Sequence, residues 1–244
     1  MYKGIDISKW QGDFTLPKGM EIDFAMIKLG GSDEGYYEDS KFQRNYDYFS
    51  SINKHIGGYY YSTATTIEQA DMEFSQIISI INGRKFDYPI FIDIESEAQI
   101  HHPLDTNVAI THLLRRLWTI GIYCGYYTTP FYRSKFRLNS IDCARYPFWA
   151  AQWSVNMPEE VSENRGMWQY GIYDGLDRDI SYVDFPEIIR QIGFNNHRTV
   201  DYYERIAYQV IRGEWGCGEE RKKLLTEAGL PYDIIQNIVN ELMS

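Results

Sequence analysis

Residues 88–97, which read Y-P-I-F-I-D-I-E-S-E, constrain the fold of this 244-residue chain more than any other stretch. The apolar run at residues 90–92 is short and continuous, as is typical of a strand buried on both faces of a parallel sheet. Asp93 and Glu95 then follow two positions apart, and such side chains point to the same face of a strand. Two acids at the carboxyl end of a barrel strand are candidates for catalysis. The alternative is an acidic strand end that leads into a polar loop.

Other short apolar segments repeat this pattern along the chain. We expect further strands at residues 2–7, 24–29, 56–61, 121–125, 148–153, 167–170 and 177–180. Phe42, Tyr46 and Phe49 recur at helical spacing after the second strand, and a capping box at residues 65–68 opens another helix. Helical periodicity is weaker in the later intervals. The alternation predicts the α/β class, as an irregular TIM-like (β/α) barrel with reduced helices in its second half.

The chain changes character after residue 192. Residues 193–199 form a polar break, and apolar residues beyond it recur at helical spacing in three segments. A glycine-rich turn around Trp215 and a break at Gly229 and Pro231 separate these segments. We therefore predict a barrel at residues 1–192, a linker at residues 193–199 and a small C-terminal three-helix module at residues 200–244.

Charge and hydropathy exclude several classes of partner. The net charge is −10, which argues against nucleic acid as a partner and against attraction to anionic lipids. No apolar stretch approaches the length that spans a membrane, so we expect no membrane insertion. The first ten residues lack the apolar segment of a signal peptide, which predicts synthesis in the cytoplasm and exit by another route.

The cysteine and histidine patterns do not predict a metal or disulfide site. Cys124, Cys143 and Cys217 are widely spaced and odd in number, so neither a disulfide framework nor a CxxC motif follows. His101 and His102 lie just after the acidic strand, and we interpret them as loop residues, because a metal site needs more ligands at defined geometry. We expect no metal and no cofactor.

Five short motifs follow one another along the first domain. They are G-I-D-I-S-K-W-Q-G at residues 4–12, G-G-Y-Y-Y-S at 57–62, F-I-D-I-E at 91–95, F-W-A-A-Q-W at 148–153 and M-W-Q-Y at 167–170. In this order they resemble glycoside hydrolase family 25, the lysozymes (muramidases) of phage endolysins and bacterial autolysins. The family closes on a V-D-x-N-like segment, and R-D-I-S at residues 178–181 departs from it at two positions.

The resemblance implies hydrolysis of the β-1,4 bond between N-acetylmuramic acid and N-acetylglucosamine. We expect Glu95 to be the general acid, with Asp93 raising its pKa by like-charge repulsion. Asp6 and Asp179 come from the first and last strands, which are neighbours in a closed barrel, so all four acids are candidate catalytic residues. On local pattern alone, Asp6 is better explained as a cap of the following loop. Retaining, inverting and acetamido-assisted mechanisms all stay open.

Aromatic side chains are candidates for stacking on sugar rings. The candidate substrate-binding residues are Tyr59, Tyr61, Trp10, Trp149, Gln152 and Trp168. The alternative is that about half of the aromatic residues fill the barrel core, because neighbouring residues of a strand point to opposite faces.

The C-terminal module resembles the cell-wall-binding repeat of certain phage lysozymes, the CW_7 type. The resemblance rests on V-I-R-G-E-W-G-C-G-E-E-R at residues 210–221, A-G-L-P-Y-D at 228–233 and V-N-E-L at 239–242. Within the module, Arg221 and Trp215 are candidate wall-binding residues. The alternatives are that Trp215 fills the small core, which we favour, and that Arg221 pairs with Glu219 or Glu220.

The expected function is therefore that of a peptidoglycan hydrolase, favoured as a monomer, whose partner is bacterial peptidoglycan. It would reach the wall after release through a holin-type pore or by lysis. One alternative is a non-catalytic wall-binding protein on a decayed hydrolase barrel. The other is a chitinase-like glycosidase, which would use a longer D-x-D-x-E pattern, whereas Phe91 stands two positions before Asp93.

Overall fold

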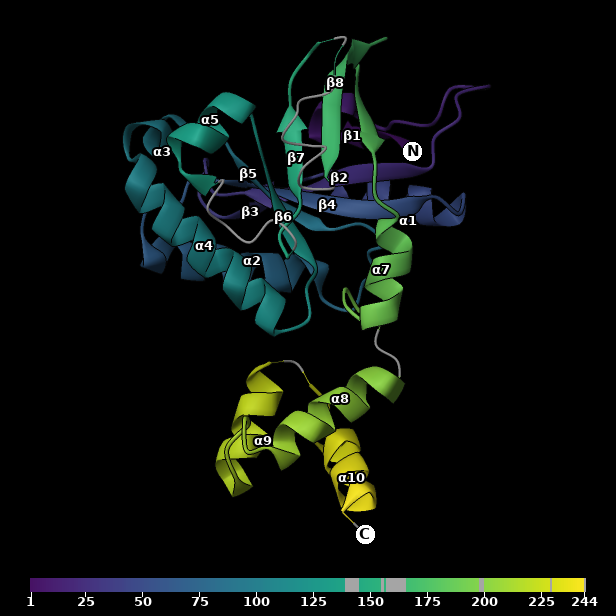
Figure 1. Ribbon diagram of the computed structural model, residues 1–244. Coiled ribbons are helices and arrows are strands. Elements are labelled where there is room, and N and C mark those ends of the chain that lie inside the picture. The colour runs from purple at the N-terminus through teal and green to yellow at the C-terminus, as the bar shows by residue number, and fades with distance from the viewer. Residues whose placement is uncertain (139–144, 155, 157–165, 198–199, 229, 244) are drawn as a thin grey trace.

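The computed structural model describes the chain apart from residues 139–144, 155, 157–165, 198–199, 229 and 244. Figure 1 shows a barrel with flanking helices and, below it, a helical module that contains the C-terminus. None of the helices in the described part of the chain combines the length and the apolar character needed to cross a membrane.

A closed barrel forms the first body. Its strands are β1 (Tyr2–Ile7), β2 (Phe24–Gly31), β4 (His55–Ser62), β5 (Ile90–Ile94), β6 (Cys124–Thr128), β7 (Phe148–Ala151), β8 (Met167–Tyr173) and β9 (Leu176–Ser181). The nine-stranded sheet closes because β1 pairs with both β9 and β2, while β3 (Tyr37–Glu38) lies beside β2 outside the ring. The parallel strands all end at one end of the barrel, which we call the upper end. The predicted irregular barrel is confirmed.

The last strand of the barrel runs against its neighbours. β9 is antiparallel to both β8 and β1, although its position matches the strand expected at residues 177–180. The reason is the two-residue turn at Asp174 and Gly175, which both have positive φ (54° and 74°). Such a turn joins antiparallel strands, whereas a parallel pair needs a longer crossover.

Helices cover the barrel unevenly. The helices outside it are α1 (Phe42–Ser51), α2 (Ile67–Ile81), α3 (Glu97–His101), α4 (Pro103–Thr119), α5 (Pro130–Lys135) and α7 (Phe185–Ile192). The long helices α2 and α4 follow the early strands and pack together on one side (Figure 1). α5 has only six residues, in agreement with the expected reduction of helices after the fifth strand.

The barrel interior is filled by large side chains that leave room only for glycine opposite them. Phe24, Met26, Phe91 and Trp149 belong to one buried cluster, which α7 closes at the lower end. A Cβ atom at Gly57 would lie 2.4 Å from the Met26 Sδ atom. Glycine in the third barrel strand is therefore required by close packing.

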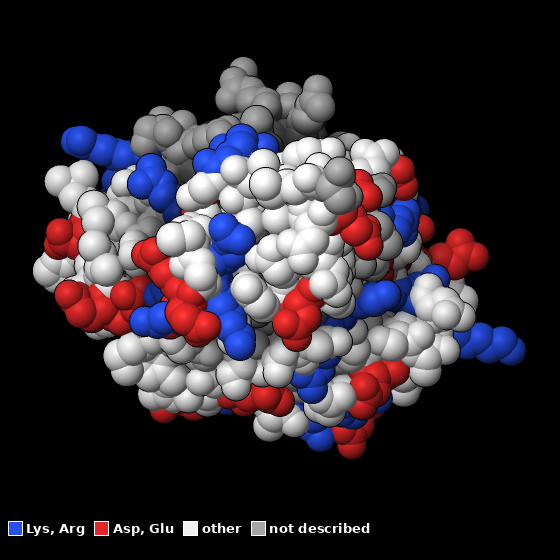
Figure 2. Space-filling view, turned by 90° about the horizontal axis from the view of Figure 1, so that it is seen from below, with Lys and Arg blue, Asp and Glu red and all other residues white. Residues whose placement is uncertain are grey.

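The C-terminal module has a core of its own. Its helices are α8 (Val200–Ile211), α9 (Gly218–Glu227) and α10 (Tyr232–Leu242), which confirms the expected three-helix arrangement. The buried apolar residues are Tyr202, Ile206, Ala207, Val210, Leu225, Leu230, Ile235 and Val239. On the face seen from below, acidic and basic side chains are interspersed, so neither sign of charge dominates (Figure 2).

The segment after α7 is attached to the lower end of the barrel. Asn195 is buried, and its backbone N–H donates to the Gly121 carbonyl at 2.9 Å. Its side chain donates to the Tyr88 carbonyl at 3.0 Å and accepts from the Tyr123 N–H at 2.8 Å. The first part of the expected linker thus belongs physically to the barrel, while the division of the chain into domains stays an interpretation.

Candidate active site

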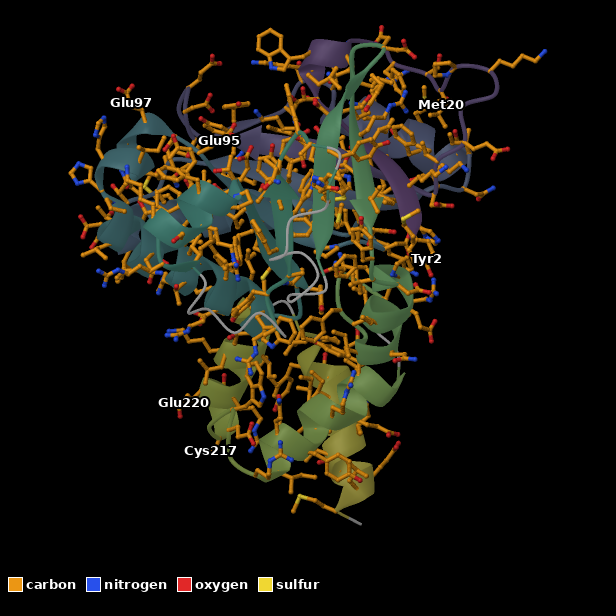
Figure 3. All side chains as sticks on the ribbon, turned by 45° about the horizontal axis from the view of Figure 1, so that its top comes forward. Tyr2, Met20, Glu95, Glu97, Cys217 and Glu220 are labelled. Atoms are coloured by element: carbon orange, nitrogen blue, oxygen red, sulfur yellow. The ribbon has the colours of Figure 1, made fainter. Side chains whose placement is uncertain are left out.

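A cavity of about 460 Å³ opens at the upper end of the barrel. It is lined by Asp6, Ser8, Trp10, Lys28, Tyr59, Tyr61, Asp93, Glu95, Tyr127, Trp149, Trp153, Gln169, Ile172 and Asp177. Figure 3 shows Glu95 at the end of the barrel that points away from the C-terminal module, on which Cys217 and Glu220 are labelled. Concave sites above the carboxyl ends of barrel strands are where (β/α) enzymes hold their catalytic residues.

Asp93 and Glu95 enter this cavity together, as the two-residue spacing predicts. Asp93 is 5% exposed at the end of β5, whereas Glu95 directly follows the strand and remains open to solvent. Burial, and then repulsion from Glu95, raises the pKa of Asp93 well above its usual value. Desolvation also raises the pKa of Glu95, and Lys28 opposes the rise.

The two acids lie close enough to repel each other, as their spacing predicts. The repulsion raises the pKa of Asp93, and its expected effect on the pKa of Glu95 stays a prediction. Burial adds to the rise at Asp93, because a carboxyl with less access to water gives up its proton less readily. Both shifts favour the protonated forms, and the accessible member, Glu95, is the one that can deliver a proton to a bound molecule.

Asp6 lies in the same cavity and is oriented by a glutamine. The Gln169 Nε2 atom donates to the Asp6 Oδ2 atom at 2.9 Å. Burial, and then the charge of Asp177, raises the pKa of Asp6 to about 7. The loop after β1 is capped by Ser8, which accepts from the Trp10 N–H at 3.3 Å, so the capping alternative does not apply to Asp6.

Asp179 stands behind the cavity wall. It is 1% exposed, and its Oδ1 atom accepts a hydrogen bond of 2.9 Å from the Trp149 Nε1 atom. The pairing of β1 with β9 is as expected, but it sets Asp179 opposite Gly4 and Asp177 opposite Asp6. Asp177 therefore lines the cavity, and the sequence reasoning did not single it out. The Asp174–Gly175 pair, a strong hairpin signal, would have revealed the direction of this strand.

The aromatic candidates divide between the cavity and the core. Tyr59, Tyr61, Trp10 and Trp149 line the cavity, and Trp10 is 79% exposed at its rim. Trp153 lines it as well, and its Nε1 atom donates to the Gln169 Oε1 atom at 3.2 Å.

Trp168 and Gln152 are not brought to the cavity. Trp168 is buried in the main core, and its Nε1 atom donates to the Gln152 carbonyl at 2.7 Å. Alternation along β8 explains the difference, because Gln169 faces the cavity and its neighbour must face the other way. Gln169, which orients both Asp6 and Trp153, is the functional candidate that the sequence reasoning missed on this strand.

Two further cavity residues carry polar groups that the sequence reasoning did not identify. The Lys28 Nζ atom lies 5.1 Å from the centre of the Tyr61 ring and supplies a positive charge beside the acids. The Tyr127 hydroxyl donates to the Gln169 Oε1 atom at 3.0 Å. In the described part of the chain, no cluster of three or more His, Cys, Asp or Glu residues could hold a metal ion.

In the C-terminal module, Trp215 and Arg221 make internal contacts. Trp215 packs against the module core and donates through its Nε1 atom to the Gln209 Oε1 atom at 3.0 Å. Arg221 donates to the Gly216 carbonyl at 3.2 Å and to the Gln236 Oε1 atom at 3.0 Å. These bonds link the glycine-rich turn to α10. A wall-binding role for either residue stays a prediction.

Comparisons with known families agree with this architecture. Residues 5–173 match the family described as glycosyl hydrolases family 25, and residues 204–243 match the CW_7 repeat. The chain is similar to the lysozyme of Streptococcus phage Cp-7, with 30% identity over 167 residues. That alignment covers 63% of this chain and 46% of the phage protein, so the chain spans less than half the length of this curated relative.

Solved structures share the fold at low sequence identity. The bacterial lysozyme from Streptomyces coelicolor has a TM-score of 0.62 at 21% identity, over 80% of this chain and 98% of that chain. The modular autolysin LytC from Streptococcus pneumoniae, solved in complex with a synthetic peptidoglycan ligand, has a TM-score of 0.62 at 19% identity. The match covers 73% of this chain and 46% of the autolysin.

Proposed function

The chain belongs to glycosyl hydrolases family 25, and from this premise we propose that it is an N-acetylmuramidase, a lysozyme. Its substrate is bacterial peptidoglycan, and the bond cleaved is the β-1,4 bond between N-acetylmuramic acid and N-acetylglucosamine. The observation that carries the proposal is the cavity in which Asp6, Asp93, Glu95 and Asp177 converge from three strands. Cleavage of a glycosidic bond requires a proton donor and usually a second carboxylate at such a position.

Glu95 is the proton donor in this proposal. Its carboxyl reaches solvent inside the cavity, and desolvation raises its pKa above the usual value, which favours the protonated form that a general acid needs. Asp93 and Asp6 are too buried to approach the leaving oxygen as freely. They stabilise positive charge at the sugar ring when ionised, or orient the substrate when protonated. Asp179 acts through Trp149 and Asp6 rather than by contact with the sugar.

The aromatic walls provide the sugar-binding surface. Trp10 and Trp153 are 79% and 62% exposed at the rim, which is unfavourable for a large apolar ring unless a ligand covers it. Sugar rings present C–H faces that stack on such side chains, while Tyr59, Tyr61 and Tyr127 offer hydroxyl groups deeper in the cavity. We propose that these residues hold the glycan across the acids.

The C-terminal module is a wall-binding element in this proposal, supported by its match to the CW_7 repeat. Interspersed charges on the face seen from below offer no long-range attraction to an acidic wall (Figure 2). Binding must then use short-range stacking and hydrogen bonds. Two linked sites on one polymer gain affinity from their high effective concentration, so the module retains the enzyme on the wall.

The substitution Glu95→Gln tests the proposed function. It should reduce clearing of a peptidoglycan suspension by about 10²- to 10⁴-fold, because the amide cannot donate the proton that the leaving oxygen requires. The matched control is Glu97→Gln, an exposed acid two residues further on that does not line the cavity. This control should retain wild-type activity.

Product analysis identifies the bond. Mass spectrometry of the digest should show new reducing ends on N-acetylmuramic acid. Reducing ends on N-acetylglucosamine would contradict the assignment, as would turnover of chitin oligomers without turnover of peptidoglycan. Binding of cell walls without release of reducing sugar by the wild-type chain would point to a non-catalytic protein.

A further inference from the structure

A buried glutamate, Glu73, lies on α2 outside the cavity. Its side chain is 0% exposed, although it carries a carboxylate. It accepts hydrogen bonds from the Ser32 hydroxyl at 2.7 Å, the Ser62 hydroxyl at 2.8 Å and the Thr63 N–H at 3.0 Å. A buried acid with several donors is held in one orientation, because each lost bond would leave a polar group without a partner.

The hydrogen bonds continue from Glu73 to the residue that follows Glu95. The Ser62 hydroxyl, which donates to Glu73, accepts from the Gln99 Nε2 atom at 3.3 Å. The Gln99 Oε1 atom accepts in turn from the Ser96 N–H at 3.2 Å. Ser62 and Gln99 are both 0% exposed, so water does not compete for these bonds.

A second branch reaches the cavity wall. The Ser32 hydroxyl donates to Glu73, and the Ser32 N–H donates to the Tyr61 carbonyl at 3.1 Å. Tyr61 lines the cavity and pairs in register with Asp93. The same carboxylate therefore holds the ends of β2 and β4 and, through Gln99, the beginning of α3.

The orientation of Glu95 depends on the main chain between β5 and α3. Within the described part of the chain, no donor forms a hydrogen bond to the Glu95 carboxylate that would fix it directly. Its direction is therefore set by the main chain between β5 and α3, which Ser96 and Gln99 hold through their reciprocal capping bonds.

We propose that Glu73 is a positioning residue for the hydrolysis reaction, which holds Glu95 in place through Ser62 and Gln99. The inference rests on the proposed function, in which Glu95 donates the proton. Near-attack geometry is sensitive to displacement, and an error of about 1 Å can cost on the order of 100-fold in rate. Glu73 does not touch substrate, so its effect falls on the chemical step.

The substitution Glu73→Gln disturbs the network without changing the size of the side chain. An amide nitrogen at the position of the Oε2 atom would face the Ser62 oxygen, which already accepts from Gln99 and from the Ala64 N–H at 3.2 Å. A hydroxyl oxygen has two lone pairs, so a third donor has no acceptor there. If the side-chain amide of the glutamine were turned the other way, its nitrogen would face the Thr63 N–H, which is also a donor. Either arrangement moves the strand end.

The expected result is a fall in kcat of about 10- to 100-fold on soluble peptidoglycan chains, with KM changed less than about 2-fold. Affinity for the same chains, measured in the Glu95→Gln background, should be unchanged by Glu73→Gln. Ser62→Ala removes the connecting hydroxyl and should lower kcat in the same way. The double variant should be no slower than the slower single variant, because both act through one network.

Ile77→Ala is the control for lost stability. Ile77 is a buried residue of the same helix that packs in the apolar core, and its side chain can form none of the hydrogen bonds of the network. Below its unfolding temperature this variant should keep wild-type kcat. The proposal is overturned if Glu73→Gln keeps full kcat, if KM rises while kcat stays constant, or if Ile77→Ala loses kcat equally at matched stability. Should Glu73→Gln not fold, Ser62→Ala decides by the same criteria.

The experiment separates this inference from the proposed function. If the wild type and Glu95→Gln are equally inactive on peptidoglycan, the proposed function fails. If Glu95→Gln is inactive and Glu73→Gln is fully active, only the positioning role fails.

Discussion

Asp6 is a carboxylate whose burial reduces stability, so Asp6→Asn should stabilise the barrel near neutral pH. Burial, followed by repulsion from Asp177, raises its pKa from 3.8 to about 7. A carboxyl with a higher pKa in the folded state binds its proton more tightly when folded, and the free energy of unfolding then falls as pH rises. The loss of free energy of unfolding is absent below about pH 4, which is near the pKa of the group in the unfolded chain, and it is complete above about pH 7.

The size of the effect follows from the pKa difference. A rise from 3.8 to about 7 is about 3 units, which corresponds to about 4 kcal/mol. This is an upper limit, because Asp177 and Asp179 share part of the repulsion with Asp6. The amide is uncharged and keeps an oxygen that can accept from Gln169. We expect Asp6→Asn to gain about 2–4 kcal/mol at pH 8 and under about 1 kcal/mol at pH 4.

Urea unfolding of both proteins at pH 4, 6 and 8 measures this difference, provided that the m value is unchanged. Asp174→Asn is a suitable control, because it makes the same chemical change in the exposed turn between β8 and β9, outside the lining of the cavity, and should change stability by less than about 0.5 kcal/mol. A stability difference between wild type and Asp6→Asn that is equal at pH 4 and pH 8 would refute the reasoning. So would a loss of stability at pH 8.

Two further predictions concern side chains packed inside the barrel. Trp149→Phe removes the 2.9 Å hydrogen bond to Asp179 and should lower the free energy of unfolding by about 1.5–3 kcal/mol at pH 7; a urea titration that shows under about 0.5 kcal/mol would contradict this. Gly57→Ala sets a Cβ atom 2.4 Å from the Met26 Sδ atom and 2.7 Å from the Tyr88 Cβ atom, and should destabilise the barrel by about 1–3 kcal/mol. An unchanged melting temperature would show that the barrel interior is looser than these distances indicate.

The buried strand β5 can be predicted from the sequence because its signal is local. Three consecutive apolar residues followed by two acids at i and i+2 define the strand, its direction and the face that carries Asp93 and Glu95. The structure confirms both side chains in one cavity. The contribution of burial to the pKa of each acid could not be predicted, because it depends on how much water reaches each carboxyl.

It is harder to predict which of two neighbouring strand residues faces the cavity when apolar residues occur on both faces of the strand. In β8, Trp168 and Gln169 are neighbours, and an aromatic residue is the more obvious sugar-binding candidate. The structure assigns the cavity to Gln169, because Trp168 fills the core outside the barrel. The place of Asp177 in the cavity could not be predicted for a related reason, since it depends on the direction in which β9 runs.

The burial of Glu73 is indicated by the sequence pattern of its helix. The buried face of α2 includes Ala70, Glu73, Ile77, Ile80 and Ile81, so an acid interrupts an apolar stripe. An acid at such a position needs hydrogen-bond partners from elsewhere in the fold. Those partners, at the ends of β2 and β4, are distant in sequence and could not be identified without the structure.

The hairpin between β8 and β9 determines the end of the barrel at which the following segments of the chain are attached. Because β9 returns toward the lower end, the chain leaves the sheet there, and α7 and the C-terminal module follow on that side (Figure 1). A parallel last strand would instead have released the chain at the rim of the cavity, beside Trp10 and Trp153. In the proposed function, a long glycan that approaches the upper end therefore does not pass the module. Segments can be lengthened, exchanged or duplicated at the lower end without obstructing the entrance.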